Sequence, residues 1–413
     1  MPRNEIHVGL EIGTTKIAVV VGEVKSDGTI KILGTGIAPS RGVRKGEIID
    51  LRQVQTCLQD ALFRAEERSD VSIRSVILSV TGNHISSLNN RRGVDLPEDH
   101  NEITTHDIEE VQRASRDVAI PREHCVLHHV LQHFHVDDQE RVVDPVGRLA
   151  SRLEASYHIV HGIRNRVMNS VLGVRELTIE VASVVFAPLS SAQVVLNREA
   201  RERGAIMVDI GGGTTDYAVY RDGAVVLSGC IPVGGDHITN DIATVLSLPQ
   251  AKAEHIKITE GSAVPGDPNV TETIHLPDDR GFVGRTIQRE ELDSIINARV
   301  EEIFELLRQR IEASCGFQGI GTGIHITGGT SQLVGVGRVA AEVLRLPVQA
   351  ARQAHHAGGT GAAHEDPTLS TAVGLVRYAQ LRESEMQARQ EGVLARLKRM
   401  LGGVKLFFLN LFS

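Results

Sequence analysis

The stretch Ile206–Gly223 reads IMVDIGGGTTDYAVYRDG, and Val8–Glu23 reads VGLEIGTTKIAVVVGE. Each stretch has an apolar run, an acidic residue, isoleucine, glycine, two threonines, a charged residue and a second apolar run. Apolar, β-rich runs on both sides of a Gly-Thr cluster predict a strand, a tight turn and a strand. Because this pattern occurs twice, the chain is predicted to contain one structural unit in two copies.

The tips of the two predicted hairpins are suited to a phosphate group. Glycine lets backbone N–H groups approach an anion closely, threonine adds hydroxyl donors, and lysine adds a positive charge. The predicted phosphate contacts are Gly13, Thr14, Thr15, Lys16, Gly211, Gly212, Gly213, Thr214 and Thr215. Glu11 and Asp209 precede the glycines and are expected to hold Mg²⁺ through its water molecules. One such turn alone would be an ordinary glycine-rich loop, but two copies favour a nucleotide.

A third glycine cluster, GIHITGGTSQLVGV at Gly323–Val336, predicts a strand followed by a helix that begins near Ser331. A helix N-terminus with bare backbone can pack on an adenosine group. The residues expected at that group are Gly328, Gly329 and Thr330.

Glu254 and Lys257 have the i, i+3 spacing of one helix face. Both could reach one side of a ribose and base. A solvated pair of charges on a helix surface explains the same spacing equally well.

Composition narrows the class of protein. The 413 residues carry 44 basic and 52 acidic side chains, with a formal charge of -8 and no Trp, which disfavours a nucleic-acid partner. The four cysteines form no CxxC pair, which favours a reducing cytosol. The polar N-terminus lacks the pattern of a secretory signal, so export is not expected.

The segments VGLEIGTTKI, VDIGGGTTD, HITGGTSQL and LSTAVGL resemble the phosphate, adenosine and connecting-helix motifs of the actin, DnaK-type chaperone and sugar-kinase superfamily. Within that superfamily the chain is similar to the FtsA family of bacterial cell-division proteins. The segments that carry this likeness include SRGVRKGEIIDL, VTGNHISSLNNRRGV, LEASYHIVHG and PVGGDHITNDIA. The resemblance implies an α/β, actin-like two-lobed ATPase fold of duplicated ribonuclease-H-like domains, with an FtsA-type 1C subdomain and a C-terminal amphipathic helix.

The resemblance also implies a division into subdomains. We expect 1A at 1–82, 166–196 and 369–381, 1C at 83–165, 2A at 197–248 and 312–368, and 2B at 249–311, then a linker at 382–392 and an amphipathic helix at 393–413. In the family, 1C serves self-association and contacts with later division proteins.

The residues of the expected 1C agree with a small α/β module. Ile103–Ile120 has a helical apolar pattern, and strand-like runs at Val126–Val136 and Leu153–Val160 flank a loop at Asp137–Gly147. Five histidines fall on or beside the first run, namely His124, His128, His129, His133 and His135. Two or three could line up as metal ligands, but no nearby group completes a tetrahedral site, so half-buried strand histidines are expected.

The expected 2B contains a helix with an apolar stripe at Leu292, Ile296, Val300, Ile303, Leu307 and Ile311. Its outward face carries Arg299, Arg308 and Arg310 among acids, a pattern that is also typical of a plain solvated face. The resemblance implies that this region binds the C-terminal tail of the tubulin-like protein FtsZ.

The segment 393–413, VLARLKRMLGGVKLFFLNLFS, is predicted to be amphipathic. Its apolar residues are Leu394, Leu397, Leu401, Val404, Phe407, Phe408, Leu411 and Phe412, and its cations include Lys398, Arg399 and Lys405. The cations and the Gly402-Gly403 break make a poor transmembrane span, so the segment should lie in the interface of an anionic membrane. A helix docked on its own domain is the alternative.

The whole pattern predicts an ATP-binding adaptor that tethers FtsZ filaments to the cytoplasmic face of the membrane at the septum and helps to assemble the divisome. Polymerising relatives such as MreB have a glutamate before a proline that positions the attacking water, where this chain has Ala187 before Pro188. Hydrolysis should therefore be slow. A PilM-like scaffold of a pilus or secretion assembly is the alternative, and a sugar kinase is a weaker one.

Overall fold

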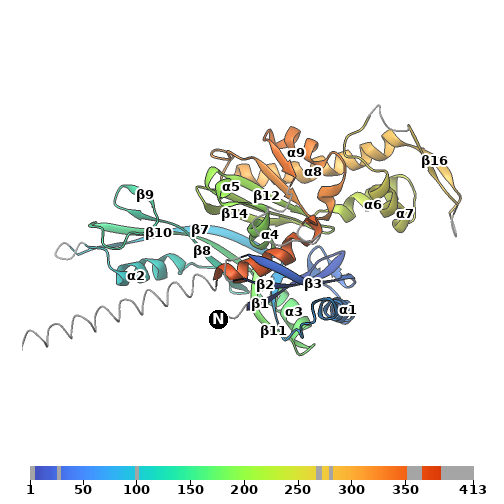
Figure 1. The fold of residues 1–413 in the computed structure, drawn as a ribbon. Helices are drawn as coiled ribbons and strands as arrows, with labels where there is room; N and C mark the ends of the chain where they lie inside the picture. The colour runs from blue at the N-terminus through green and yellow to red at the C-terminus, as the bar shows by residue number, and fades with distance from the viewer. Residues whose placement is uncertain are drawn as a thin grey trace, which may run out of the picture.

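The computed structural model describes residues 5–25, 29–97, 102–266, 272–278, 282–350 and 365–382. They form two lobes, each built on a five-stranded sheet, and a separate four-stranded module (Figure 1). Among the helices of these ranges, none combines the length and the hydropathy of a membrane-spanning segment. The predicted linker at 382–392, apart from Arg382, and the amphipathic segment at 393–413 lie outside the described residues.

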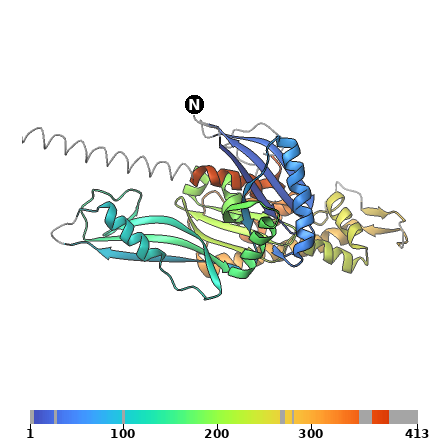
Figure 2. The ribbon, with the colours of Figure 1, turned by 90° about the horizontal axis from the view of Figure 1, so that it is seen from below.

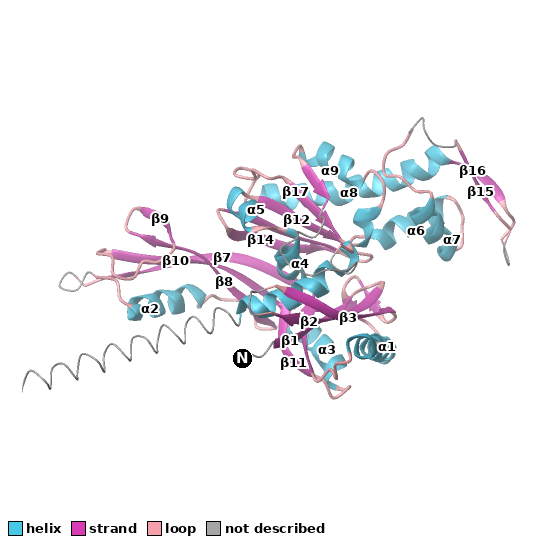
Figure 3. Cartoon of the chain, viewed as in Figure 1, coloured by secondary structure: helices cyan, strands magenta, loops and turns pink. Residues whose placement is uncertain are grey.

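The two five-stranded sheets have the same topology. The first has the order β11-β6-β1-β2-β3 and the second β18-β17-β12-β13-β14 when read in the matching direction. In each sheet the central hairpin is antiparallel, a third strand pairs antiparallel with it, and two further strands pair parallel. The repeat that the hairpin sequences predict therefore extends through both sheets (Figure 3).

The first lobe combines the sequences before and after the four-stranded module. Its strands are β1 (Glu5–Ile12), β2 (Lys16–Val24), β3 (Ile30–Pro39), β4 (Val43–Arg44), β5 (Glu47–Ile48), β6 (Ser75–Val80) and β11 (Glu180–Phe186). Its helices are α1 (Leu51–Ser69), α3 (Arg164–Arg175) and the helical residues 370–382, which follow the 3-10 turn η4 (Pro367–Leu369). Buried and exposed residues do not alternate along β2, because both faces of this strand are covered. Ile17 to Val21 are all buried.

The second lobe begins after α4 (Ala187–Val195), which lies between the lobes. Its elements are α5 (Arg198–Arg203), β12 (Ala205–Ile210), β13 (Thr215–Arg221), β14 (Ala224–Ile231), α6 (Gly235–Val245), β17 (Ile324–Thr327), η1 (Gly329–Gln332), α9 (Val336–Leu344) and β18 (Val348–Ala350). All residues of α4 except Gln193 are buried. One buried cluster contains Val20 and Phe186 of the first sheet and Met207 of the second, so the lobes share a core around α4.

An arm extends from the second lobe, with α7 (Gln250–Thr259), β15 (Thr273–Leu276), β16 (Arg285–Gln288) and α8 (Arg289–Ser314). The apolar stripe predicted along α8 is buried at every position from Leu292 to Ile311. The stripe runs past the arm and joins the second-lobe core, which anchors the arm to the lobe.

The four-stranded module contains β7 (Ile85–Asp95), α2 (Thr105–Arg116), β8 (His124–Val136), β9 (Gln139–Val142) and β10 (Arg152–Ile163). The predicted loop at Asp137–Gly147 is wrong in part, because it contains β9, which extends β8 as a hairpin. The module and the arm lie at opposite ends of the molecule (Figure 2). The module also contacts the second lobe, where the Ser87 hydroxyl donates to the Ser228 carbonyl at 2.7 Å.

Candidate functional site

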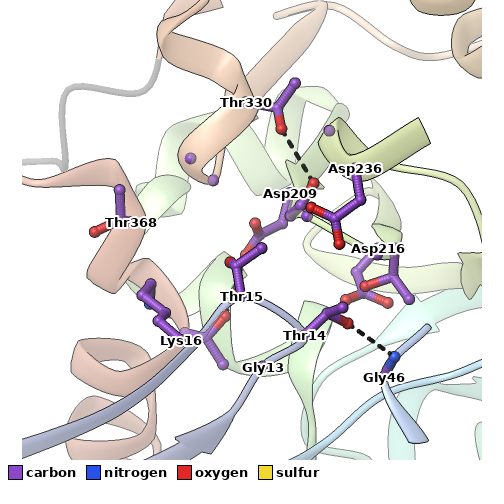
Figure 4. A pocket seen from close by; sticks show the side chains of 18 of the residues that line it. Gly13, Thr14, Thr15, Lys16, Gly46, Asp209, Asp216, Asp236, Thr330 and Thr368 are labelled. Atoms are coloured by element: carbon purple, nitrogen blue, oxygen red, sulfur yellow. Dashed lines mark hydrogen bonds between the residues drawn. The ribbon is translucent and has the colours of Figure 1, made fainter. Parts of the chain in front are cut away.

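A cavity of about 360 Å³ lies between the tips of the β1–β2 and β12–β13 hairpins (Figure 4). It is lined by nearly all the residues that the sequence predicts at the phosphate, magnesium and adenosine groups, namely Glu11, Gly13, Thr14, Thr15, Lys16, Asp209, Gly211, Gly212, Gly213, Thr214, Glu254, Lys257, Gly328, Gly329 and Thr330. The fold thus brings together segments from both lobes and from the arm, which are far apart in the sequence.

Thr215 is the predicted phosphate contact that does not line this cavity. Its side chain is fully buried on the opposite face of β13, and its hydroxyl donates to the Val233 carbonyl at 2.8 Å. Side chains alternate along a strand, so the next residue, Asp216, lines the cavity instead. Applying the two-residue period of the predicted strand would have identified Asp216.

The first glycine of each hairpin closes its turn. Gly13 N–H donates to the Lys16 carbonyl and Gly211 N–H donates to the Thr214 carbonyl, both at 2.9 Å. Within the described residues, the backbone N–H groups of the turn residues that follow have no hydrogen-bond partner, namely those of Thr14, Thr15, Gly212 and Gly213. Two such donors from each lobe are therefore available to an anion in the cavity.

Three acidic side chains line the cavity near the tips of the two hairpins. Glu11 pairs with Lys16 at 3.1 Å between Oε2 and Nζ. Asp209 Oδ2 accepts from the hydroxyls of Ser191 at 2.7 Å and Thr371 at 3.1 Å. Burial and the charge of Glu11 nevertheless raise the pKa of Asp209 to about 6.

Asp216 is the third of these acids. Burial is the main cause that raises the pKa of Asp216 to about 7, and the Asp209 charge adds to it. The Thr81 hydroxyl donates to Asp216 Oδ1. Asp236, at the start of α6, also lines the cavity, and burial raises its pKa as well. Such a cluster of buried carboxylates is stabilised when a cation shares the space.

The glycine cluster after β17 packs directly against the second hairpin. Gly328 has φ +89°, and a Cβ atom there would lie 2.4 Å from Asp209 Oδ1, so the position requires glycine. The Thr330 hydroxyl donates to the Gly211 carbonyl at 3.1 Å, which ties the cluster to the hairpin turn.

The helix predicted near Ser331 is wrong. Residues Gly329–Gln332 form a short 3-10 turn, η1, and α9 begins only at Val336. Leu333 is extended with ψ 130° and Gly335 has φ +83°, and neither conformation continues a helix. The extended connection places Gln332 and Leu333 in the cavity wall, where the sequence predicted no contact.

Lys257 is a buried residue of the cavity wall and not part of a solvated pair. It is 8% exposed, and its Nζ donates to Glu254 Oε2 at 2.6 Å, to the Thr239 hydroxyl at 2.9 Å and to the Gly235 carbonyl at 3.2 Å. These contacts join α7 to the start of α6. The Glu254 side chain is more exposed, with 42% of its surface accessible.

Ala187 lines the cavity, as do Ser79 and Thr81. It is the first residue of α4, and Pro188 follows it. Ala187 therefore presents a methyl group to the cavity, where polymerising relatives are expected to have a glutamate that orients water.

The three arginines that the sequence singles out on α8 do not gather. Arg299 pairs with Asp241 of α6 at 2.6 Å and Arg308 pairs with Glu305 on α8 itself at 2.5 Å. At about 3.6 residues per turn, their spacing puts Arg299 and Arg308 on opposite sides of the helix. Arg310 is exposed and returns to the Arg299 side.

The predicted strand histidines have separate environments. His128 is buried, its Nε2 accepts from the Phe186 N–H at 2.9 Å, and burial lowers its pKa to about 3. His135 meets the Ser156 hydroxyl at 2.9 Å. Within the described ranges, one group of three side chains has its possible ligand atoms within 4.8 Å of one another, namely His106, Asp107 and Glu110 on α2, a largely exposed set whose Asp107 already caps the helix.

Comparisons with known proteins agree with this geometry. A family model described as "Cell division protein FtsA" matches residues 206–374, and one described as "SHS2 domain inserted in FTSA" matches residues 82–161. The cell division protein FtsA of Pseudomonas aeruginosa is 36% identical over 96% of this chain and 97% of its own length. That of Escherichia coli strain K12 is 37% identical over 94% of this chain and 93% of its own length.

Solved structures support the actin-like fold. A PilM–PilN type IV pilus biogenesis complex matches with a TM-score of 0.62 at 15% identity, over 92% of this chain and 99% of that chain. MreB5 of Spiroplasma citri, solved with ADP, matches with a TM-score of 0.53 at 14% identity, over 94% and 98%. At such identities the likeness shows the fold alone, and it confirms the predicted actin-like α/β architecture.

Proposed function

This chain belongs to the FtsA family of actin-like cell division proteins, and on that premise we propose that it binds ATP and Mg²⁺ in the cavity and uses the bound state to hold FtsZ filaments at the membrane. The superfamily fold implies nucleotide binding. The proposal adds that the ligand is ATP with Mg²⁺, that the partner is the C-terminal tail of FtsZ, and that the location is the membrane surface at the septum.

The observation that carries the nucleotide proposal is the set of four unpartnered N–H groups at the hairpin tips, within the described part of the chain. Thr14 and Thr15 supply two from the first lobe, and Gly212 and Gly213 supply two from the second. A phosphate chain between the tips would accept from both lobes at once. Lys16 is close enough to the same space to exchange its Glu11 partner for a phosphate oxygen.

Mg²⁺ fits the residues present. Glu11, Asp209 and Asp216 face one cavity, and the raised pKa values of both aspartates indicate that negative charge there lacks compensation. Glu11 and Asp209 would hold the ion through its waters, and Asp216 would add a third carboxylate. When bound, the ion would neutralise phosphate charge and screen these acids from one another.

The partner surfaces follow the subdomain division proposed from the sequence. The four-stranded module corresponds to the proposed 1C, with surfaces for self-association and for later division proteins, and the arm with α8 corresponds to the proposed 2B. For the FtsZ tail on 2B we retain Arg299, Arg308 and Arg310 as candidate contacts. Arg310 is the best placed of them, because Arg299 and Arg308 already have acidic partners on the protein.

The membrane contact is proposed to be the segment 393–413. Its apolar and cationic residues are suited to the boundary between headgroups and acyl chains. The decisive experiment is sedimentation with vesicles of the intact chain and of a chain that ends at Gly392, each with and without ATP and a peptide of the FtsZ tail.

We expect the shortened chain to keep ATP and peptide binding and to lose the vesicles. Recruitment of FtsZ to vesicles by the shortened chain would contradict the tether. The alternative of a pilus scaffold is supported by likeness of fold alone. The alternative of a sugar kinase would be favoured only if a sugar stimulated the release of ADP.

A further inference from the structure

A second cavity, of about 540 Å³, lies apart from the nucleotide cavity, between the end of α4, α5 and the helical residues 370–382. Among the described residues, Arg198, Arg201 and Arg377 line it, together with one acid, Glu202. Glu202 pairs with Arg198 at 2.7 Å, so that pair is neutral. The other two cations of the wall are Arg201 and Arg377.

The Arg201 guanidinium is held in place. Its Nη2 donates to the Ala192 carbonyl at 2.8 Å and to Gln193 Oε1 at 3.0 Å, and its carbon lies 5.3 Å from the centre of the Tyr220 ring. Its other terminal nitrogen, Nη1, makes no hydrogen bond within the described residues. A guanidinium that is already fixed, with an N–H donor available at Nη1, loses little side-chain conformational entropy when it binds a ligand.

Arg377 faces the same cavity from another element. It is half-buried on the helical residues 370–382, and its Nη1 donates to Gln380. Burial and the nearby Arg201 charge lower the pKa of Arg377. The two half-buried guanidinium groups therefore lie near each other on one cavity wall, where a single anion could accept from both.

We propose that this second cavity binds a phosphate group, with Arg201 and Arg377 as its two guanidinium ligands from α5 and the helical residues 370–382. Guanidinium is the cation that best fits phosphate oxygens, because its parallel N–H groups match them in geometry. A phosphate of this kind could belong to a lipid headgroup or to a soluble phosphate ester, and the two sources share the same recognition chemistry.

The position in the chain favours the lipid headgroup. Leu381 lines the cavity, and only the connection 382–392 separates it from the segment 393–413. That connection would span about 16 Å as a helix and roughly 36–40 Å fully extended. This step rests on the proposed function, since it needs 393–413 in the interface. The body would then touch the bilayer at two places, and two weak membrane contacts together hold a protein far better than one.

The test uses the full chain and sn-glycerol 3-phosphate as the soluble probe, measured by titration calorimetry. The protein is first saturated with Mg²⁺ and ATP, because the nucleotide cavity would also accept a phosphate. We expect Arg377→Gln to weaken binding of the probe about 10- to 100-fold. The matched control is Arg203→Gln, which removes the same charge from α5 at an exposed residue that pairs with Glu199 and does not line the cavity.

A second variant protects the test against misfolding. Arg201→Lys keeps the positive charge but loses the planar contact with Tyr220, and we expect intermediate affinity for the probe with unchanged ATP binding. Equal probe affinity in the wild type, Arg377→Gln and Arg203→Gln would overturn the proposal. The proposal would also be overturned if the probe did not bind at all and Arg377→Gln left vesicle binding unchanged. Binding of an acidic peptide in place of the phosphate would overturn it as well.

Vesicles separate the two sources. Loss of binding by Arg377→Gln to vesicles that contain phosphatidylglycerol, but not to neutral vesicles, assigns the headgroup. Loss of probe binding alone assigns a soluble ester. Leu401→Glu in the full chain removes the proposed tether and should leave probe binding intact, so failure of the tether and failure of the phosphate site give different results.

Discussion

Thr15 lies where a side chain on Gly212 would have to be. A Cβ atom built on Gly212 would come within 2.3 Å of Thr15 Cγ2, closer than any real contact of this kind. The two residues belong to different lobes, at the tips of the β1–β2 and β12–β13 hairpins. The absence of a side chain at residue 212 is therefore what lets the tips of the two hairpins approach each other this closely.

Gly212→Val should abolish ATP binding and leave the fold intact. The added side chain would force the hairpin tips apart, so that the donors of the two lobes could not reach one phosphate chain together. Affinity for a fluorescent ATP analogue and the thermal midpoint of the apo protein measure the two effects. Gly337→Ala is the matched control, because Gly337 lies on α9, does not line the cavity, and a Cβ atom there would meet its nearest neighbour, Val348 Cγ1, at an ordinary 3.4 Å.

Asp216→Asn should stabilise the ligand-free protein above pH 7. The folded-state pKa of Asp216 is about 7, well above its ordinary value of 3.8, so folding favours the protonated form. Its contribution to stability is fully present below pH 3.8 and is lost as pH rises through 7. Asparagine stays neutral and can still accept from Thr81. We expect a gain of about 2–4 kcal/mol in the free energy of unfolding at pH 8.

Denaturant titrations of both proteins at pH 4 and pH 8 measure this effect. The gain should shrink at pH 4, where the aspartate of the wild type is already protonated in the folded state. Saturation with Mg²⁺ and ATP at pH 8 should also reduce it, because the cation would compensate the charge in the wild type. A gain of equal size at pH 4 would show that charge is not its cause.

The sequence predicts much of this site because the hairpin tips are local structures. Glycine, threonine and the flanking apolar runs define both turns from residues that are adjacent in the chain, and the apolar stripe of α8 follows from helical periodicity. The signal for Asp216 is also local, because the two-residue period of its strand puts it on the face opposite Thr215. The helix predicted near Ser331 begins only at Val336, because Gly335 has a positive φ that a helix cannot contain.

Other parts of the site depend on tertiary structure alone. Asp236 lies on α6, beyond β13 and β14, and lines the cavity only because the Gly211 and Gly212 carbonyls accept from the first N–H groups of α6. Arg201 and Arg377 are distant in the sequence and meet because α5 and the helical residues 370–382 line one cavity. No local pattern marks either arrangement, so only the fold could show them.

His158→Ala should loosen the four-stranded module from the second lobe. His158 is 1% exposed, and its two ring nitrogens meet Asn89 within the module and the Ser228 hydroxyl of β14, each at 2.8 Å. Truncation removes both hydrogen bonds and leaves a space between the two units, which should cost about 2–4 kcal/mol of unfolding free energy. Guanidinium unfolding measures the loss, and hydrogen exchange should rise at β7 and β14.

His133→Ala is the matched control for this variant. His133 lies in the same module and is half-buried, and its side chain makes no hydrogen bond within the described residues. We expect it to cost less than about 1 kcal/mol. Equal losses for the two variants would show that the loss at His158 does not come from the contact between the module and the second lobe.

Ala187→Glu should accelerate ATP hydrolysis, which is expected to be slow in the wild type. Ala187 lines the cavity, and its methyl group can neither orient nor deprotonate a water molecule. A glutamate at the start of α4 would supply a carboxylate on that wall, and a positioned general base typically contributes about 10²- to 10⁴-fold to a rate. The acids Asp209 and Asp216 in the same cavity would raise the pKa of the new carboxyl, which suits a base that works near neutral pH. We therefore expect phosphate release at least about 10-fold faster than in the wild type at pH 8, with the difference shrinking as pH falls.

The control variant is Ala187→Gln, whose side chain has nearly the same size but is not a base, so its hydrolysis should stay slow. If the glutamine variant hydrolysed ATP as fast as the glutamate variant, or if the wild type already matched both, the missing carboxylate would not be what limits turnover.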